Sequence, residues 1–354
     1  MSQNNSLGAC ARINTAFTHS FLPPAFVVVF VVGSLSNIWG LRSVHAGWHD
    51  IGSINIFMLN LGAADLLYLL TLPFLVDYYA RDSDWRFGQP FCKVTRFCFH
   101  LNLYGSIGFL TCISVYRYLG IVHPMRVLGR ITSRHSLAAA AAVWLCVVVQ
   151  ILPDAFFRKN DPERPNSCFD TTSDQLIRSY LPYSVAWTVT GFAVPLAIIL
   201  ACYAHVALVL ATQANVDPLL KRRCLKLVLV LVVLFSVCFV PYHVFRNANL
   251  TTRVLKLDGT CRRGFRGVYV AHQVGRFLAC LNSVINPLIY LVGNDDFLAR
   301  LRRFTQRAKL SVAGRTDAVI YRKTKGAEPG SPESPTQEGI PNRVEQNFHI
   351  SGDV

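Results

Sequence analysis

Cationic and polar side chains recur at helical spacing within three otherwise apolar stretches of the chain. In each stretch the spacing places the polar groups on one face of a helix. Arginine in such a setting is suited to binding an anion, because a guanidinium donates paired hydrogen bonds to phosphate or carboxylate oxygens. The three sets are Arg96, His100 and Tyr104; His243 and Arg246; and Tyr269, His272, Gln273 and Arg276.

Few acidic residues are available to neutralise these cations, and Asp170 and Asp77 are the nearest candidates. Charged side chains at membrane depth usually face a water-filled cavity or pair with an opposite charge. We therefore expect the outer ends of three helices to converge on a positively charged site for an anionic small molecule. The alternative is that the arginines extend to the membrane surface or pair with loop acids.

Long apolar runs supply the helices that position these residues. The chain of 354 residues is 52% hydrophobic and only 16% charged, whereas soluble chains carry about 25% charged residues. A membrane-spanning helix needs about 20 apolar residues. The chain is therefore predicted to be an all-α membrane protein, a seven-transmembrane helical bundle. The seven runs are 21–41, 51–76, 97–116, 136–153, 179–212, 227–242 and 268–293.

The predicted organisation has four parts. An extracellular N-terminus, 1–20, precedes the membrane domain, 21–295. Residues 296–310 alternate apolar and basic side chains as a short amphipathic helix on the membrane surface does. Residues 311–354 are rich in Ser, Pro and Gly, which is typical of a disordered cytoplasmic tail. Basic residues in the short inner loops favour a multi-pass protein with its N-terminus outside the cell.

Charge distribution narrows the choice of partner. The net charge of +15 first suggests nucleic acid, anionic lipid or an anionic ligand. The basic residues fall on both sides of the predicted membrane. The inner excess fits membrane topology and lipid contact, whereas the outer excess fits an anionic ligand. We therefore expect membrane lipid but no nucleic acid as a partner.

Four cysteines, Cys10, Cys92, Cys168 and Cys261, fall on the outer, oxidising side, which predicts two disulfides with three possible pairings. Their spacing does not resemble a zinc site. In the inner half, Asp65 is a buried acid that either holds a cation such as sodium or makes structural hydrogen bonds.

A series of motifs, one in each predicted span, resembles the rhodopsin-like G-protein-coupled receptors. Within that class the chain is similar to the nucleotide-sensing purinoceptors, especially the ADP-preferring type, in its stretches at 85–88, 96–104, 168–174, 243–246 and 273–276. The span motifs are Asn37; Asn60-Leu61 with Asp65; Tyr116-Arg117-Tyr118; Trp144; Pro195 with Tyr203; Phe235-x-x-Cys238-Phe239-x-Pro241; and Asn286-Pro287-Leu288-Ile289-Tyr290.

The resemblance implies roles for individual residues. It implies disulfides Cys92–Cys168 and Cys10–Cys261, no enzymatic activity, and no cofactor beyond a sodium ion near Asp65. Arg117, Tyr203, Pro241, Asn286 and Tyr290 would serve G-protein coupling and activation. Independently of the resemblance, the pattern Asn4-Asn5-Ser6 predicts a glycosylation site at Asn4. The implied ligand contacts are Arg96, His100, Tyr104, Asp170, His243, Arg246, Asn249, Arg253, Tyr269, Gln273 and Arg276.

The implied function is a plasma-membrane receptor for an extracellular nucleotide that signals through a heterotrimeric G protein, phospholipase C and calcium. Tyr116 and Phe239 depart from common receptor motifs, and the ADP-preferring type more often has Lys where Arg246 stands. A dicarboxylate such as 2-oxoglutarate or succinate is the alternative ligand, since the same arginines would bind it. An organic-anion transporter should show internal repeats and broken helices, and neither is evident in the sequence. An enzyme is disfavoured by the absence of a recognisable catalytic constellation in the sequence.

Overall fold

The computed structural model describes residues 16–45, 53–123, 132–160, 165–212 and 218–293, all within a compact unit that covers Met1–Leu298. The described residues form helices and loops, and no β-strand occurs among them. The predicted surface helix 296–310 and the predicted disordered tail 311–354 lie outside the described residues, as do Asn4 and Cys10.

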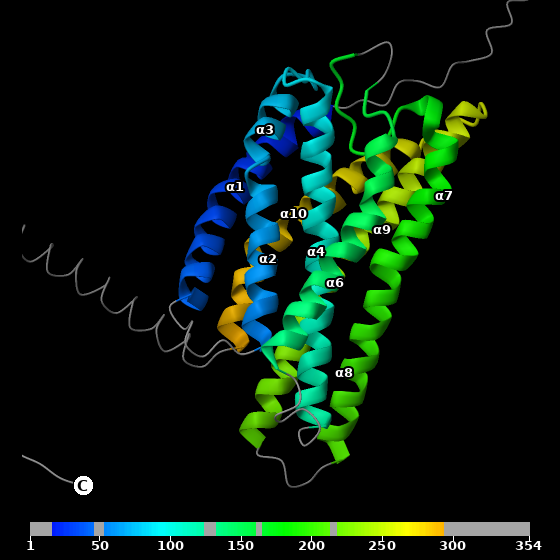
Figure 1. The fold of residues 1–354 in the computed structure, drawn as a ribbon. Coiled ribbons are helices and arrows are strands. Elements are labelled where there is room, and N and C mark those ends of the chain that lie inside the picture. The colour runs from blue at the N-terminus through cyan, green and yellow to red at the C-terminus, as the bar shows by residue number, and fades with distance from the viewer. Residues whose placement is uncertain (1–15, 46–52, 124–131, 161–164, 213–217, 294–354) are drawn as a thin grey trace, which may run out of the picture. The chain divides into compact units, whose positions relative to one another are not determined.

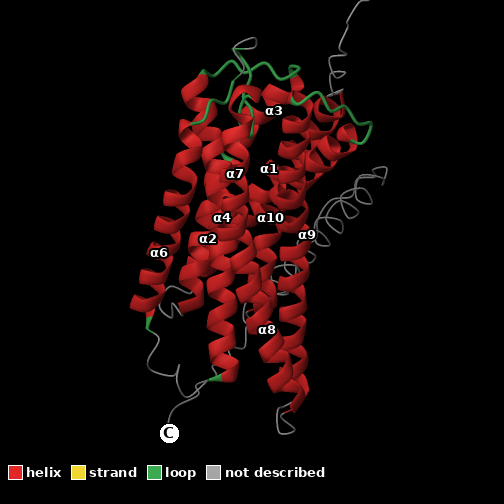
Figure 2. Cartoon of the chain, turned by 90° about the vertical axis from the view of Figure 1, so that its right-hand side faces the viewer, coloured by secondary structure: helices red, strands yellow, loops and turns green. Residues whose placement is uncertain are grey.

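The helices lie side by side as an up-and-down bundle (Figure 1, Figure 2). Four of the predicted apolar runs each fall within one helix, whereas the described parts of 51–76, 136–153 and 179–212 each extend over two or three consecutive helical elements. Most helices extend beyond the apolar run because their polar ends continue the helix towards water. The elements are α1 (Ala16–His45), α2 (Ser53–Leu69), α3 (Leu72–Ala80), α4 (Gln89–Val122), α6 (Ser133–Ile151), η2 (Leu152–Phe156), η3 (Asp174–Leu176), α7 (Ile177–Thr188), η4 (Val189–Ala193), α8 (Val194–Thr212), α9 (Pro218–Leu257) and α10 (Phe265–Gly293).

Six helical segments of the described chain are long and apolar enough to cross a membrane. The last helix, α10, has 29 residues, about 43 Å at the usual helical rise, and it packs against α9 and α1. Its outer half is less apolar because several of its polar residues face the interior of the bundle. The six segments and α10 together form the predicted seven-helix bundle.

Two of the spans are interrupted where proline removes a backbone donor. The second span bends between α2 and α3, just before Pro73, where the Thr71 hydroxyl donates to the Tyr68 carbonyl at 2.7 Å. The fifth span widens into the π-helical turn η4 before Pro195. These irregular turns change the direction of the outer ends of both spans.

The outward faces of the helices are apolar. Valine and leucine side chains such as Val28, Leu35, Leu145 and Leu208 are more than half exposed. On a protein in water, an apolar surface of this kind would mark a site of association with another molecule. On a protein in a bilayer, an apolar outer surface is expected because it faces the lipid chains.

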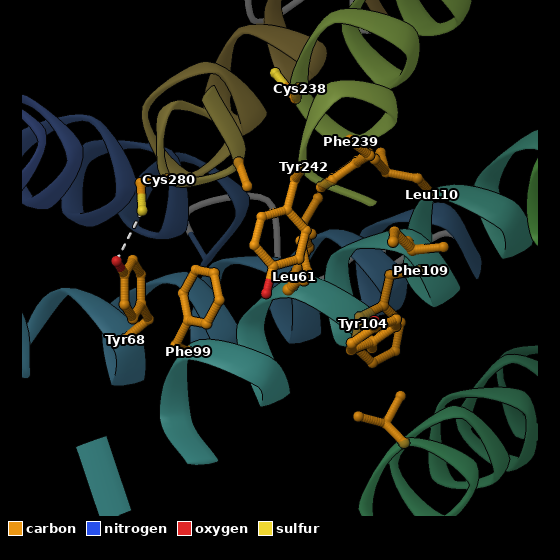
Figure 3. Close-up of a cluster of buried hydrophobic side chains, with 14 of the residues drawn as sticks. Leu61, Tyr68, Phe99, Tyr104, Phe109, Leu110, Cys238, Phe239, Tyr242 and Cys280 are labelled. Carbon is orange, nitrogen blue, oxygen red and sulfur yellow. Dashed lines mark hydrogen bonds between the residues drawn. The ribbon is translucent and has the colours of Figure 1, made fainter. Parts of the chain in front are cut away.

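A common core joins α2, α4, α9 and α10 beneath the outer ends of the helices (Figure 3). The Tyr68 hydroxyl and the Cys280 thiol make a buried hydrogen bond of 2.8 Å between α2 and α10. Nearby, the Phe99 and Tyr242 rings meet edge to face at 5.6 Å and join α4 to α9. This core fixes the relative positions of the four helices that carry most of the candidate site.

Candidate functional site

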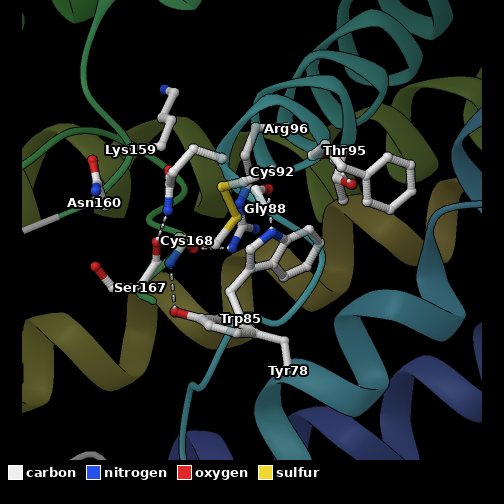
Figure 4. Close-up of a disulfide and its surroundings, with 12 residues drawn as sticks. Tyr78, Trp85, Gly88, Cys92, Thr95, Arg96, Lys159, Asn160, Ser167 and Cys168 are labelled. Atoms are coloured by element: carbon white, nitrogen blue, oxygen red, sulfur yellow. Dashed lines mark hydrogen bonds between the residues drawn. A yellow bond between two sulfur atoms is a disulfide. The ribbon is translucent and has the colours of Figure 1, made fainter. Parts of the chain in front are cut away.

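The loop between α6 and α7 is attached to the outer end of α4 by a disulfide and by hydrogen bonds. The predicted disulfide Cys92–Cys168 is confirmed (Figure 4). The Cys168 backbone N–H donates to the Tyr78 hydroxyl at 3.2 Å, and the Cys168 carbonyl accepts from Arg96 Nη2 at 2.5 Å. Trp85 adds a backbone bond of 2.7 Å to the Asn166 carbonyl. This loop therefore forms a fixed wall of the site.

Asp170, two residues after the disulfide, faces a histidine and an arginine of α10. Its Oδ2 lies 3.5 Å from His272 Nε2 and 3.6 Å from Arg276 Nη1. Burial disfavours the charged carboxyl, but the electrostatic interactions of Asp170 with His272 and with the arginines Arg276 and Arg96 outweigh burial and lower the pKa of Asp170 below its usual range. The loop thus supplies a carboxylate that neutralises part of the cationic site.

A second carboxylate, Asp154, was not among the predicted site residues. It lies in η2 at the outer end of α6 and is almost fully buried. Its Oδ1 accepts from Lys159 Nζ at 2.7 Å and from the Tyr180 hydroxyl at 2.8 Å, and its Oδ2 lies 3.4 Å from His100 Nδ1. Burial lowers the pKa of Lys159, and the contact with Asp154 opposes that shift only in part.

Arg246 of α9 is held by aromatic side chains. Its Nη2 donates to the Tyr180 hydroxyl at 2.9 Å and its Nη1 to the Tyr104 hydroxyl at 3.3 Å. The guanidinium carbon lies 4.5 Å from the centre of the Trp187 ring, which is close enough for a cation–π contact. Since Tyr180 also donates to Asp154, a continuous hydrogen-bonded chain runs from Arg246 to Asp154.

Tyr104 reaches this position because Gly191 in the η4 turn has no side chain. A Cβ added to Gly191 would lie 2.7 Å from the Tyr104 ring, a distance at which something must move. The Tyr104 hydroxyl also lies 3.2 Å from His243 Nε2. The widened turn therefore brings α4, α9 and the fifth span together around one tyrosine.

Two tyrosines connect the two carboxylate clusters. The Tyr242 ring lies 5.9 Å from the Arg246 guanidinium and 6.0 Å from the His272 ring. The Tyr79 hydroxyl accepts from Arg96 Nη2 at 3.4 Å, and the Tyr79 ring lies 5.0 Å from the Arg276 guanidinium. The arginines of α4, α9 and α10 therefore belong to one connected site, as their spacing predicted.

The structure brings most of the predicted ligand residues together in or beside the two carboxylate clusters. The three predicted ligand residues that lie outside these clusters are Arg253, Tyr269 and Asn249. Arg253 is engaged by the loop, since its Nε donates to Asp174 at 2.8 Å and its Nη1 to the Thr171 hydroxyl at 2.9 Å. The Tyr269 hydroxyl bonds to Thr18 of α1 at 2.7 Å, and Asn249 is buried in α9. The residues that lie in or beside the two clusters are Arg96, His100, Tyr104, Asp170, His243, Arg246, Gln273 and Arg276.

The interpretation of Asp77 as a counter-charge is wrong. Asp77 pairs with Arg81 one helical turn away, at 2.7 Å, on the exposed side of α3. Hydrogen bonding to Asp77 raises the pKa of Arg81. The acids that do face the site are Asp154 and Asp170.

Cations still outnumber carboxylates around the two clusters. Among the described residues, Arg96, Lys159, Arg246 and Arg276 are buried there, against Asp154 and Asp170. In the described part of the chain, the Nε atoms of Arg96, Arg246 and Arg276, and Nη2 of Arg276, have no hydrogen-bond partner. Buried donors without partners are costly, so the arrangement is complementary to an additional anion.

The inner half of the bundle contains a separate polar cluster around Asp65. Its carboxylate accepts from Asn102 Nδ2 at 2.7 Å and from Asn286 Nδ2 at 2.9 Å, and Ser283 donates to Asn102 at 3.2 Å. The Tyr203 hydroxyl lies 2.8 Å from Ser114 Oγ. The predicted structural hydrogen bonds of Asp65 are therefore present, and its second role as a cation ligand stays a prediction.

The remaining predicted coupling residues lie on three helices. Arg117 is half-buried near the inner end of α4, and Pro241 lies inside α9 without ending the helix. Tyr290 belongs to the last turns of α10, where side chains are outside the described part. Cys261 is disulfide-bonded, but because Cys10 lies outside the described residues, the Cys10–Cys261 pairing stays a prediction.

Comparison with known proteins assigns the family. Residues 48–290 match the 7 transmembrane receptor (rhodopsin family) model. The chain is 41% identical to purinoceptor 1 of Homo sapiens over 325 residues, covering 89% of this chain and 84% of that protein. It is 38% identical to the Gallus gallus purinoceptor 1 over 310 residues, covering 86% and 84%. It is 35% identical to purinoceptor 4 of Xenopus laevis over 321 residues, covering 89% and 59%. With its seven-helix bundle and connected cationic site, the chain belongs to the rhodopsin family of seven-transmembrane receptors and, within it, to the purinoceptors.

Proposed function

We propose that this protein is a plasma-membrane receptor for an extracellular nucleotide and that it signals through a heterotrimeric G protein. The observation that carries the proposal is the excess of buried guanidinium groups over carboxylates at the outer ends of α4, α9 and α10. The similarity to receptors named purinoceptors supports the same ligand class. The resemblance in the sequence favours an adenine nucleotide of the ADP type.

A nucleotide di- or triphosphate suits this site better than a dicarboxylate. Arg96, Arg246 and Arg276 lie on three different helices, so that a ligand with adjacent phosphates could accept hydrogen bonds from all three. Gln273, which follows His272 in α10, adds a buried amide. 2-Oxoglutarate and succinate would use the same arginines, but the similarity to purinoceptors does not favour them.

The anion would act by competing for cations that now face carboxylates. A phosphate that binds Arg246 and Arg276 would replace their electrostatic interactions with Asp154 and Asp170. That exchange would favour a different packing of α9 against α10, with Pro241 as the bend in α9. An outward shift at the inner end of α9 would open a cleft beside Arg117 for the G protein, which is a population shift between two packings.

Calcium imaging of cells that express the full chain tests the proposed ligand class. We expect a dose-dependent calcium rise with at least one of ADP, ATP, UDP and UTP, and none with 2-oxoglutarate or succinate. Untransfected cells and cells expressing the Arg117→Ala variant are the controls, because the first lack the receptor and the second lacks the proposed coupling residue. A response to a dicarboxylate alone, or to none of the compounds, would contradict the nucleotide proposal.

Asp65 provides a second test, directed at the inner polar cluster. We propose that its carboxylate, with the oxygens of Asn102 and Ser283 nearby, can hold a sodium ion that favours the inactive packing. Replacing sodium by choline in a binding assay on membranes should then raise agonist affinity for the original chain. Asp65→Asn should abolish this difference, since an amide carries no charge for the ion. An unaltered sodium effect in Asp65→Asn would leave the cluster with a structural role only.

The proposed topology places the N-terminus, with a glycan on Asn4 and a Cys10–Cys261 disulfide, outside the cell. The helix 296–310 and tail 311–354 would then lie on the cytoplasmic side.

A further inference from the structure

A second concave surface lies between α9 and α10, away from the cationic site. It has a volume of about 640 Å³, and its walls are apolar side chains of both helices with two arginines, Arg263 and Arg266, at one end. The apolar lining consists mainly of Pro241, Phe245, Val270, Ala271, Val274 and Leu278. Val244 and Val237 of α9 are about half exposed on the outward face, so the groove opens where lipid surrounds the bundle.

The shape of the groove follows from small residues on α10. Gly267, Ala271 and Gly275 recur every four residues, which places them on one face of the helix. At Gly275 the helices are in contact, because an added Cβ would lie 3.0 Å from the Pro241 backbone. At Gly267 an added Cβ would meet nothing within 4 Å. The two helices therefore touch near Pro241 and leave open space towards the outer end of α10.

The two arginines of the groove have no acidic partner within the described chain. Arg263 and Arg266 are exposed, and no described carboxylate lies within ion-pair distance of either. The nearby acids Asp258 and Asp174 are committed to Arg178 and Arg253. Both arginines also lie at the N-terminal end of α10, whose first turn contains no acidic residue. The helix dipole disfavours cations at this end of a helix. An anion bound here would be stabilised both by the dipole and by the two arginines.

The dimensions match one lipid chain of the outer leaflet. From Arg266 to Leu278 the helix rises about 18 Å, at 1.5 Å per residue. Half of the hydrocarbon core of a bilayer is about 15 Å thick. A molecule with its anionic group at the two arginines can therefore lay a hydrocarbon chain along the groove as far as Pro241. A soluble nucleotide would leave the apolar walls unused.

We propose that this groove binds one anionic phospholipid of the outer leaflet, with its phosphate between Arg263 and Arg266 and one acyl chain against Val270, Val274 and Phe245. This site is separate from the proposed nucleotide site and does not depend on it. Because Pro241 forms part of the groove, the bound lipid contacts both α9 and α10 beside the proline of α9. The lipid thereby stabilises the packing of the two helices seen in this structure.

Photolabelling of the purified full chain tests the proposal. The probe is phosphatidylglycerol with a diazirine on one acyl chain, in detergent micelles, followed by digestion and mass spectrometry of the labelled peptides. We expect labelling concentrated on Phe245 and on residues 268–278. The double variant Arg263→Gln/Arg266→Gln should reduce this labelling about tenfold, the loss expected for a charge-assisted hydrogen-bond pair. Arg86→Gln changes an exposed arginine that pairs with Asp84 in the loop between α3 and α4, so it is the matched control and should leave the labelling unchanged.

Two further comparisons separate a lipid site from a simple anion site. Ala271→Trp fills the groove but keeps both arginines, so it should also abolish the labelling. Glycerol phosphate, which has the headgroup chemistry without a chain, should not compete. Equal labelling by phosphatidylcholine, unchanged labelling in the double variant, labelling spread over the outward faces of other helices, or competition by glycerol phosphate would each overturn the proposal. The thermal unfolding midpoint of each variant verifies that it is folded.

Discussion

Replacing Arg246 with alanine should weaken agonist potency in the calcium assay by about 100-fold, while the receptor still reaches the cell surface. Truncating one partner of a buried charge pair typically costs 2–5 kcal/mol, and about 2.7 kcal/mol corresponds to 100-fold. Folding should tolerate the change, because Tyr180 still donates to Asp154 and Lys159 still neutralises that carboxylate. Arg276→Ala should have a comparable effect from the opposite wall of the site.

Conservative and matched variants separate site chemistry from general charge. Arg246→Lys keeps the positive charge but loses the planar contact with Trp187 and the paired donors, so its loss should be smaller than that of alanine. Arg178→Ala removes an exposed outer arginine that pairs with Asp258, and potency should stay within about threefold, as expected for a screened surface charge. Normal potency in both Arg246→Ala and Arg276→Ala would mean that the agonist binds elsewhere and that these arginines serve the fold.

Replacing Asp154 with asparagine should destabilise the receptor more than any surface change. The substitution leaves Lys159 buried without a counter-charge. The cost of breaking one side of a buried ion pair is about 3–5 kcal/mol. The substitution also replaces one of the two carboxylate oxygens by an NH2 group, which leaves a single uncharged acceptor for Lys159 and for Tyr180, the residue that in turn holds Arg246. The expected result is a lower thermal unfolding midpoint in detergent and reduced surface expression.

A compensating variant shows whether the ion pair is the cause. In Asp154→Asn/Lys159→Met the uncompensated cation is gone, and replacing both members of a buried pair is often nearly neutral. The double variant should therefore recover most of the lost stability. Asp174→Asn is the matched control, because that carboxylate is largely exposed and pairs with Arg253, and such pairs contribute about 0–1 kcal/mol. If Asp154→Asn is as stable as Asp174→Asn, the network of Asp154 is not important for folding.

Local sequence patterns were sufficient to predict the helices and to predict which cationic residues share a helix face. Apolar runs of sufficient length predicted the bundle because a bilayer allows few other structures for such runs. The spacing of Arg96, His100 and Tyr104 correctly placed them on one face of α4, since helical geometry relates residues that are close in sequence. The same rule placed His243 with Arg246 on α9, and His272 with Arg276 on α10.

Partners from distant segments could not be predicted in this way. Asp154 follows a proline at the end of an apolar run, where an acid ordinarily faces water. Only the fold encloses it among His100 of α4, Lys159 of the loop and Tyr180 of α7. Asp77 looked equally suitable as a counter-charge, yet α3 turns it outward.

For the outer cysteines and for the groove between α9 and α10, some features follow from the sequence and others only from the tertiary structure. The sequence by itself determined that cysteines on the outer side would pair and that small residues recur on α10, because compartment and helical period are local properties. Residue spacing left three pairings open, the family resemblance implied Cys92–Cys168, and the tertiary structure confirmed that pair. Only the tertiary structure decided that Gly275 meets Pro241. Burial requires each charge and each close contact to have a partner, but which partner it has depends on the packing of helices that are far apart in the chain.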